Sequence, residues 1–417
     1  MIFAVLMPNA TCLSLCRTDV LAGDVITRPS HGMLAAIIET TLGDDVFRED
    51  KTTLDFEAHV AAICGREAGM FVVTGTMANQ LCYHALVTSR PCGIVVAQDA
   101  HSINFEGGGP SVLSGGMIQP ISPSNGKYLR VEDLEKYAVV EDGDVHKCPT
   151  GLVSMENTAH GVIIPLNELS RIRDWTREHG IKTHLDGARL FEAVAAGAGS
   201  LRDYCTLVDL VSVDFSKNLG APMGAMVLGD QTLIQRMRRT KKAIGGGLRQ
   251  SGVITAAARH ALYENFGPGK EISSPILGVS QRLARVVAAQ WLRRGGRLTK
   301  PVETNLVWLD IEVLGVERAT LNMLASTYGV LLDGPRIVIH HQIEQRGIDN
   351  LYKLFDDLLE PARRADTITA PATSPCILKQ SPLHFIADSK HGQPNGFTNG
   401  LSENGRPEND MAVIQQV

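Results

Sequence analysis

The run Val211-Ser-Val-Asp-Phe-Ser-Lys-Asn-Leu-Gly220 indicates the fold, because an apolar strand here ends in a polar loop that carries Lys217. About thirty residues upstream, a second apolar run ends at Asp186-Gly-Ala-Arg189. Apolar strands alternate with helical patterns from about residue 70 to 230, which predicts a parallel α/β sheet. Such sheets bind ligands at the carboxyl ends of their strands. We therefore expect Asp186 and Lys217 at one edge of the sheet.

A lysine and an aspartate in this arrangement suit one cofactor, pyridoxal 5'-phosphate. The lysine amine links covalently to the cofactor aldehyde, while the carboxylate keeps the pyridine nitrogen protonated, so that the ring accepts electrons. The alternative interpretation is that Lys217 is a surface-loop lysine and Asp186 caps a helix. Three further stretches favour the cofactor.

The first stretch is Met70-Phe-Val-Val-Thr-Gly-Thr-Met-Ala-Asn79, which predicts a strand, a tight turn and a helix through Ala85. Gly75 permits a close backbone approach, and Thr76 with the free N–H groups of the helix start forms an anion site suited to a phosphate. Taken alone, the pattern is also that of a common strand-to-helix turn.

The other two stretches carry a histidine and a glycine-rich loop. His101 follows the predicted strand Gly93-Ile-Val-Val-Ala97, where it either stacks on a cofactor ring, handles protons, or is a solvated loop histidine. The run Lys241-Lys-Ala-Ile-Gly-Gly-Gly-Leu-Arg-Gln250 places three glycines between basic residues. This composition suits phosphate or carboxylate binding, and equally a flexible surface loop.

Seven ordered motifs together resemble those of the L-threonine aldolases, the low-specificity and L-allo-threonine enzymes of fungal type. They are Gly43-Asp-Asp-Val46, Thr74 to Asn79, Asp99-Ala-His101, Glu156-Asn-Thr158, His184 to Leu190, Ser216 to Pro222 and Gly245 to Gln250. The resemblance extends from about residue 24 to 360. It implies an α/β fold of fold-type I, aspartate aminotransferase-like, with a mostly parallel sheet, a smaller C-terminal α+β domain, and a homotetramer built as a dimer of dimers.

The resemblance also implies roles for single residues. Lys217 would hold the cofactor covalently and Asp186 would contact its pyridine nitrogen. Cofactor binding is expected from Gly75, Thr76, His101, Asp186, Arg189 and Lys217. Substrate binding is expected from Arg189, Arg336 and Lys242, the last in the active site of a neighbouring subunit. Two guanidinium groups on one carboxylate would fix the amino acid in one orientation.

The reaction implied is the reversible retro-aldol cleavage of L-threonine, L-allo-threonine or a related β-hydroxy-α-amino acid to glycine and an aldehyde. It requires removal of the hydroxyl proton by a base or a base-held water. His101 and His160 are the candidates, although His101 fits stacking better and His160 also suits a structural role. The alternatives are β-elimination, racemisation, or a weakly catalytic paralogue with an assembly role.

Two positions depart from the family pattern. Gly23 stands where the family has a serine that helps to hold the substrate carboxylate, and Phe47 stands where it has a tyrosine. Each lost hydrogen bond to a charged group costs about 1.5–3 kcal/mol in binding. We expect a shifted substrate preference or a weakened activity.

The composition is that of a globular enzyme. The 417 residues are 44% hydrophobic and carry a net charge of −5, without the basic bias of a nucleic-acid-binding protein. The eight cysteines show no CxxC pairs, so we expect reduced thiols, no metal site and a cytoplasmic protein. The apolar start, residues 1 to 7, is too short to span a membrane.

The expected domains are an N-terminal extension over 1–23, a cofactor-binding large domain over 24–270 and a small domain over 271–364. Residues 365–417 are rich in Ser, Thr, Pro, Asn and Gly, which predicts a disordered tail.

Overall fold

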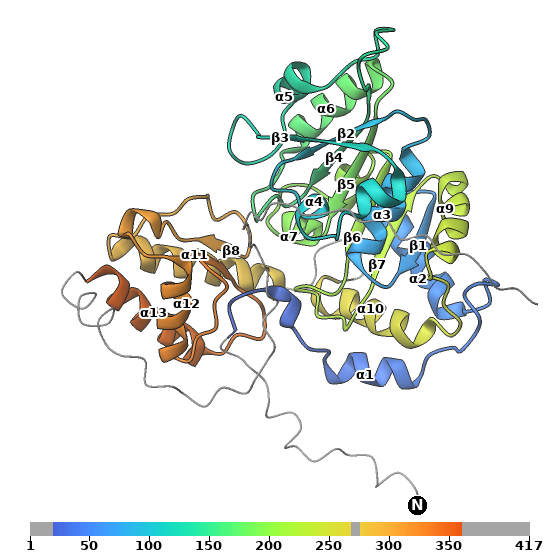
Figure 1. Ribbon diagram of the computed structural model, residues 1–417. Helices are drawn as coiled ribbons and strands as arrows, with labels where there is room; N and C mark the ends of the chain where they lie inside the picture. The colour runs from blue at the N-terminus through green and yellow to red at the C-terminus, as the bar shows by residue number, and fades with distance from the viewer. Residues whose placement is uncertain (1–19, 268–275, 361–417) are drawn as a thin grey trace, which may run out of the picture. The chain divides into compact units, whose positions relative to one another are not determined.

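A computed structural model describes residues 20–267 and 276–360, and its centre is a seven-stranded sheet of order β1-β7-β6-β5-β4-β2-β3 (Figure 1). The strands β2 to β6 run parallel to one another, whereas β7 runs antiparallel to both β1 and β6. The expected α/β fold with a mostly parallel sheet is confirmed. The strands are β1 (Ala68–Val72), β2 (Gly93–Ala97), β3 (Met117–Ile121), β4 (Thr150–Glu156), β5 (Lys182–Gly187), β6 (Leu210–Asp214) and β7 (Ala225–Gly229).

Helices cover both faces of this sheet. Successive residues of a strand point to opposite faces, so the side chains of one strand pack against helices on both sides. Met70 and Val72 pack with α3 and α9, whereas Phe71 between them packs with α2 and α10. The helices around the sheet are α1 (His31–Ile38), α2 (Lys51–Ile63), α3 (Gly75–Leu86), α4 (His101–Asn104), α5 (Val131–Tyr137), α6 (Leu166–Glu178), α7 (Leu190–Ala195), α8 (Leu201–Cys205), α9 (Gln231–Ala243) and α10 (Gly252–Asn265). Short helical turns lie at η2 (Asp24–Ile26) and η3 (Pro110–Ser114).

A second hydrophobic core lies in the C-terminal part of the chain. The strands β8 (Leu306–Trp308) and β9 (Arg336–Val338) pair antiparallel, beside α11 (Ile276–Arg293), η4 (Glu312–Leu314), α12 (Arg318–Thr327) and α13 (Gln345–Leu359). Trp291, Phe355 and Leu351 are fully buried there. Leu21 joins this core, and its neighbour Val20 forms a bridge with Leu331.

The expected domain boundaries stay a proposal, since the boundary at 270 and the tail over 365–417 lie outside the described residues. So do residues 1–19 of the expected extension. The described thiols are free, and Cys64, Cys82, Cys92 and Cys205 are buried. Within the described ranges, no helix has the length and apolar character to cross a membrane. The same residues contain no cluster of ligands that could hold a metal ion.

Candidate active site

The strand register brings the predicted residues to one edge of the sheet. Asp186 lies one residue before the end of β5, beside Glu156 of β4 and Ser212 of β6. Lys217 follows the end of β6 by three residues. Because β4, β5 and β6 are parallel, their carboxyl ends share an edge, as expected from the sequence.

Hydrogen bonds from three directions hold the loop that carries Lys217. Thr27 Oγ1 donates to the Lys217 carbonyl at 2.6 Å, and Asn265 Nδ2 donates to the Leu219 carbonyl at 2.7 Å. At the start of the loop, Asp214 Oδ1 accepts from both the N–H and the hydroxyl of Ser216, each at 2.6 Å. The lysine Nζ lies 3.2 Å from Asp214 Oδ2.

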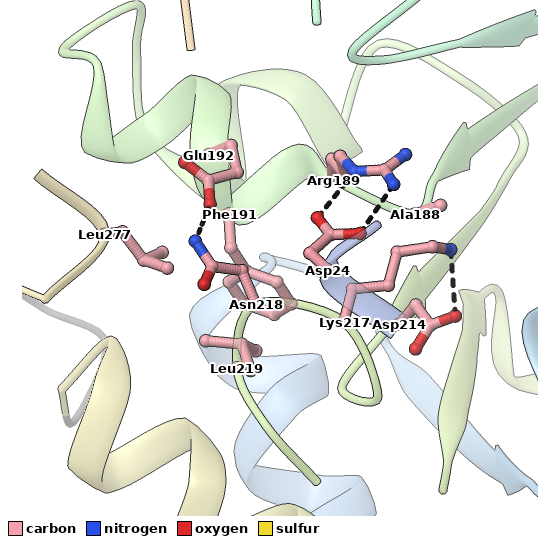
Figure 2. A pocket seen from close by; sticks show the side chains of 10 residues that line it. All are labelled: Asp24, Ala188, Arg189, Phe191, Glu192, Asp214, Lys217, Asn218, Leu219 and Leu277. Atoms are coloured by element: carbon pink, nitrogen blue, oxygen red, sulfur yellow. Dashed lines mark hydrogen bonds and ion pairs between the residues drawn. The ribbon is translucent and has the colours of Figure 1, made fainter. Parts of the chain in front are cut away.

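Four charged residues meet in the pocket beside this loop, and we call them the paired cluster: Asp24, Arg189, Asp214 and Lys217 (Figure 2). Arg189 donates to Asp24 from Nε at 2.8 Å and from Nη2 at 2.7 Å. Burial alone would raise the pKa of the Asp24 carboxyl, but the adjacent guanidinium outweighs it and lowers the pKa to about 2. Asp24 therefore stays ionised, and each acid of this cluster faces a base.

A buried carboxylate behind the paired cluster joins the lysine loop to α11. Glu192 Oε1 accepts from Asn218 Nδ2 at 2.6 Å, and Oε2 accepts from Gln281 Nε2 at 2.6 Å. Burial raises the pKa of Glu192 to about 7. Asn218 is the residue next to Lys217, so this chain of bonds fixes the loop against the C-terminal part of the protein.

A second group of charges, which we call the acid cluster, consists of Glu106, Glu156 and Asp186. Asn79 links two of its members, because Nδ2 donates to Asp186 Oδ2 at 2.7 Å and to Glu106 Oε1 at 2.9 Å. The Ser212 hydroxyl donates to the side-chain oxygen Oδ1 of Asn79 at 2.7 Å, which fixes the orientation of the side-chain amide.

His101 is the imidazole at this acid cluster. Its Nδ1 lies 2.9 Å from Glu106 Oε1, and its backbone N–H donates to Glu156. About half of the side chain, 52%, is exposed, so the ring lies at the surface of the site.

Glu156 has an unusual protonation state. Burial, and then the negative charge of Asp186, raise its pKa to about 8. Glu156 therefore holds its proton at neutral pH.

The predicted phosphate turn lies at the start of α3. Thr74 caps the helix by accepting from the Met77 N–H, and the N–H groups of Gly75 and Thr76 have no acceptor among the described residues. A Cβ at Gly75 would lie 3.0 Å from Asp214 Oδ2. A side chain at position 75 would therefore crowd the Asp214 carboxylate at the end of β6.

His160, the second candidate for proton transfer, lies apart from the Lys217 pocket. Its Nε2 is 2.9 Å from Asp99 Oδ2, and Trp308 packs edge-on against the ring. The residue has a φ of +52°, a left-handed conformation that is uncommon outside glycine. Asp99 and His160 line a pocket together with Glu156, so they face the acid cluster.

The two remaining substrate candidates lie at different places. Arg336, at the start of β9, is partly buried and donates to the Ala22 carbonyl at 3.2 Å. Burial, and then the charge of Arg189, lower the pKa of Arg336. Lys242 is exposed at the end of α9 and does not line the Lys217 pocket, whereas Lys241 is buried against Asp45 at 2.9 Å.

The departures from the family pattern also have clear positions. Gly23 is buried with an extended backbone, φ −172° and ψ 160°, which any residue can adopt. Phe47 is 73% exposed.

Sequence reasoning did not assign four residues that shape the site: Asp24, Asn79, Glu106 and Asp214. Asp214 had a visible signal, because a carboxylate ends an otherwise apolar strand three residues before the lysine. Asp24 likewise stands between apolar residues. Their partners could not be read from the sequence, since the Asp24–Arg189 contact joins residues 165 positions apart.

Comparisons with known proteins agree with this geometry. The family model described as beta-eliminating lyase matches residues 20–313. The alanine racemase TOXG of Cochliobolus carbonum is 62% identical over 337 residues, covering 81% of this chain and 86% of that protein. The aldolase vrtJ of Penicillium aethiopicum is 47% identical, covering 81% and 85%. A low-specificity L-threonine aldolase of Candida albicans is 39% identical, covering 81% and 89%.

A solved structure of the same fold is that of the threonine aldolase of Leishmania major. It superposes with a TM-score of 0.67 at 21% identity and covers 82% of this chain and 99% of the other. The resemblance predicted from seven motifs is therefore confirmed at the level of the family. The sheet-edge geometry, the family match and the relatives lead to one conclusion: the chain belongs to the beta-eliminating lyase family and is an enzyme related to the threonine aldolases.

Proposed function

We propose that the chain is a pyridoxal phosphate-dependent aldolase that reversibly cleaves L-threonine, L-allo-threonine or a related β-hydroxy-α-amino acid to glycine and an aldehyde. The observation that carries the proposal is the placement of Asp186 and Lys217 at the carboxyl ends of adjacent parallel strands. The start of α3 approaches the same loop at Gly75. The aldolase relatives, at 47% and 39% identity, support the same activity.

The residues present fit the cofactor. Asp186 would contact the pyridine nitrogen, Lys217 would hold the aldehyde carbon, and Gly75 with Thr76 would bind the phosphate through the free N–H groups of α3. When bound, the cofactor supplies an electron sink for the bond that breaks at the substrate α-carbon. His101, half-exposed and fixed by Glu106, would stack on the ring.

Arg336 and Arg189 would bind the substrate carboxylate. Asp24 already takes two N–H groups of Arg189. Arg336 therefore supplies the larger share of new hydrogen bonds, and Arg189 contributes charge from a fixed position. A carboxylate fixed in this way determines which bond of the α-carbon is aligned for cleavage.

His101 and His160 are the two candidates to take the hydroxyl proton. His101 uses Nδ1 toward Glu106, which leaves Nε2 for the substrate or a water molecule. His160 lies against Asp99, a carboxylate that would stabilise the charged imidazole after proton uptake. Lys242 would contribute from a neighbouring subunit, as its exposed position on α9 allows.

The experiment is incubation of the purified, cofactor-loaded protein with L-threonine, L-allo-threonine and L-phenylserine separately, with glycine and aldehyde both measured. Release of both from any of the three supports the aldolase and ranks the side-chain preference. Ammonia with an oxo acid would instead identify β-elimination. A stable visible cofactor band with no product from any substrate would favour a non-catalytic paralogue.

Alanine racemisation is a second candidate function, favoured by the 62% identity to an alanine racemase. Alanine has no β-hydroxyl group, so it cannot undergo retro-aldol cleavage, whereas racemisation needs only the exchange of its α-proton. The test is incubation with L-alanine followed by chiral separation. D-alanine without any aldehyde release from the three hydroxy amino acids would replace the aldolase proposal by this one.

Assembly and location complete the proposal. Exposed apolar side chains gather along the N-terminal part of the chain, at Val25, Ile38, Leu42 and Phe47. Exposed apolar side chains are suited to contacts between subunits, and from the resemblance to the threonine aldolases we propose a homotetramer. Light scattering of the purified protein would give its mass. We also propose a cytoplasmic location and the domain boundaries at 24, 270 and 364.

A further inference from the structure

Asp214 is a buried carboxylate to which the proposed function gives no task. It is 6% exposed and ends β6 (Figure 2). Its two oxygens have different partners. Oδ1 accepts hydrogen bonds from the N–H and the hydroxyl of Ser216, and Oδ2 lies 3.2 Å from Lys217 Nζ. The Lys217 side chain is 20% exposed. An ion pair this sheltered is screened much less than one in water.

The surroundings leave Asp214 as the direct counter-ion of the lysine. Asp24 is taken up by Arg189 through two hydrogen bonds. Glu192 is taken up by Asn218 and Gln281. His341, from the C-terminal part, contacts Asn218 rather than the lysine. Arg336 lies toward Arg189 and Ala22. From α3, the uncharged residue Gly75 approaches Asp214, since an added Cβ there would lie 3.0 Å from Oδ2.

We propose that Asp214 is a positioning residue that stabilises the proton on Lys217 and thereby promotes proton exchange between this lysine and the substrate α-carbon. The inference rests on the proposed function, because it needs a substrate whose α-carbon reaches Lys217. It assigns Asp214 to α-proton transfer and leaves the cleavage of the Cα–Cβ bond to other groups.

The step balances without any other reactant. Once the substrate amine has replaced Lys217 on the cofactor, the freed neutral Lys217 amine would take the α-proton: a C–H bond breaks, an N–H bond forms, and the electron pair stays with the substrate carbon. The new ammonium is stabilised by the Asp214 carboxylate, which itself gains and loses nothing. In reverse, the ammonium returns a proton to the α-carbon, which completes glycine after aldehyde release.

The first test uses the cofactor-free protein, so it does not depend on activity. Wild type and Asp214→Asn are treated with a small amine-acylating reagent over a pH series, and acylation of Lys217 is measured by peptide mass spectrometry. Without the carboxylate Lys217 loses its ion-pair partner at 3.2 Å, and we expect about tenfold faster acylation of Lys217 near neutral pH. The matched control is Asp55→Asn, which removes the counter-ion of the exposed Lys51 at 2.7 Å. Lys51 acylation should change by less than about twofold. Equal Lys217 acylation in wild type and Asp214→Asn would overturn the proposal.

The second test uses the loaded enzyme in heavy water. Asp214→Asn should exchange the α-proton of glycine about tenfold more slowly than wild type. Its single-turnover aldehyde release should stay within about threefold, because that step precedes return of the proton. An equal fall in both rates would mean that Asp214 only supports the loop, and would overturn the proposal.

The two tests separate this inference from the proposed function. If wild type forms no visible cofactor band and releases no aldehyde, the proposed function fails, while the acylation series still decides whether Asp214 controls the proton of Lys217. If Asp214→Asn does not fold, Asp214→Ser removes the same charge and keeps a hydroxyl near Ser216. It should show the same acceleration of acylation.

Discussion

The paired cluster and the acid cluster lie at the same edge of one sheet, yet they handle charge in opposite ways. In the paired cluster, Asp24 and Asp214 each face a base, and the pKa of Asp24 falls to about 2. In the acid cluster, the carboxylates are held by amide and imidazole groups, and the pKa of Glu156 rises to about 8. Burial is severe at both places. The presence or absence of a cation decides which carboxyl group stays charged.

The comparison also indicates what the acid cluster is suited to receive. A cationic group placed beside Asp186 would offset the negative charge that now raises the pKa of Glu156. A protonated pyridine ring is such a group. The paired cluster, already balanced, instead suits a ligand that brings its own negative charge together with new hydrogen bonds, such as a carboxylate beside Arg336.

The largest expected effect comes from Lys217→Ala, which removes the only cation of the paired cluster that can react. We expect loss of the visible absorbance of the bound cofactor and a fall in turnover of at least about a thousandfold. Absorbance spectra and aldehyde release measure both. Near wild-type turnover in this variant would contradict the assignment of Lys217.

Asp24→Ala breaks the balance of the paired cluster by leaving Arg189 buried without its carboxylate. Removal of one partner of a buried ion pair costs about 3–5 kcal/mol. Urea unfolding should show this loss, with Asp55→Ala as the control on an exposed pair, where at most about 1 kcal/mol is expected. A loss below 1 kcal/mol for Asp24→Ala would mean that Arg189 finds another partner.

Glu156→Gln removes the raised pKa from the acid cluster. In the cofactor-free protein the native carboxyl binds a proton between pH 4.5 and about 8, whereas the unfolded one has released it. The contribution of Glu156 to wild-type stability therefore falls as the pH rises through this window. The variant lacks this contribution and should be roughly 2–4 kcal/mol more stable than wild type at pH 8.5.

Thermal unfolding from pH 5.5 to 8.5 measures this difference. Part of the slope should remain in Glu156→Gln, because Glu192 has a pKa of about 7 and acts in the same direction. Glu178→Gln, at an exposed position on α6, is the control and should follow wild type. Parallel curves for wild type and Glu156→Gln would show that Glu156 is not the neutral acid.

The smallest effect is expected from Gly23→Ser, at the border of the paired cluster. The backbone is extended there, and the nearest atom to an added Cβ is Val25 Cγ2 at 3.4 Å, so a serine fits. Stability should change by less than about 0.5 kcal/mol. The apparent affinity for L-threonine should rise by up to about tenfold, as expected for one hydrogen bond to a charged group. An unchanged KM would show that position 23 does not contact the carboxylate.

Much of the fold could be predicted from local pattern. The apolar runs at Met70, Gly93, Leu152 and Leu210 become strands because they are buried on both faces, and one of the expected helical patterns between them forms as α6 (Leu166–Glu178). The antiparallel direction of β7 was not predicted, since a short apolar run carries no information on its direction.

The residues of the site also divide into those that the sequence pattern predicts and those that it does not. Lys217 and Asp186 follow strands of regular spacing, so their edge could be predicted. Glu106 could not be predicted as their neighbour, because its place depends on the turn after α4 and on a contact with Asn79, 27 residues earlier. The same holds for Asp99 with His160, which meet only when β2 and β4 lie side by side.

The short segment from Val20 to Asp24 connects the C-terminal core with the core around the seven-stranded sheet. At one end, Leu21 exchanges backbone hydrogen bonds with Leu331 and Val338. At the other end, Asp24 accepts two hydrogen bonds from Arg189, which lies two residues after β5 of the large sheet. Only Ala22 and Gly23 lie between these anchors, which leaves little slack. A displacement of the C-terminal core would therefore act on Asp24 through only two intervening residues, and through Asp24 on the guanidinium of Arg189.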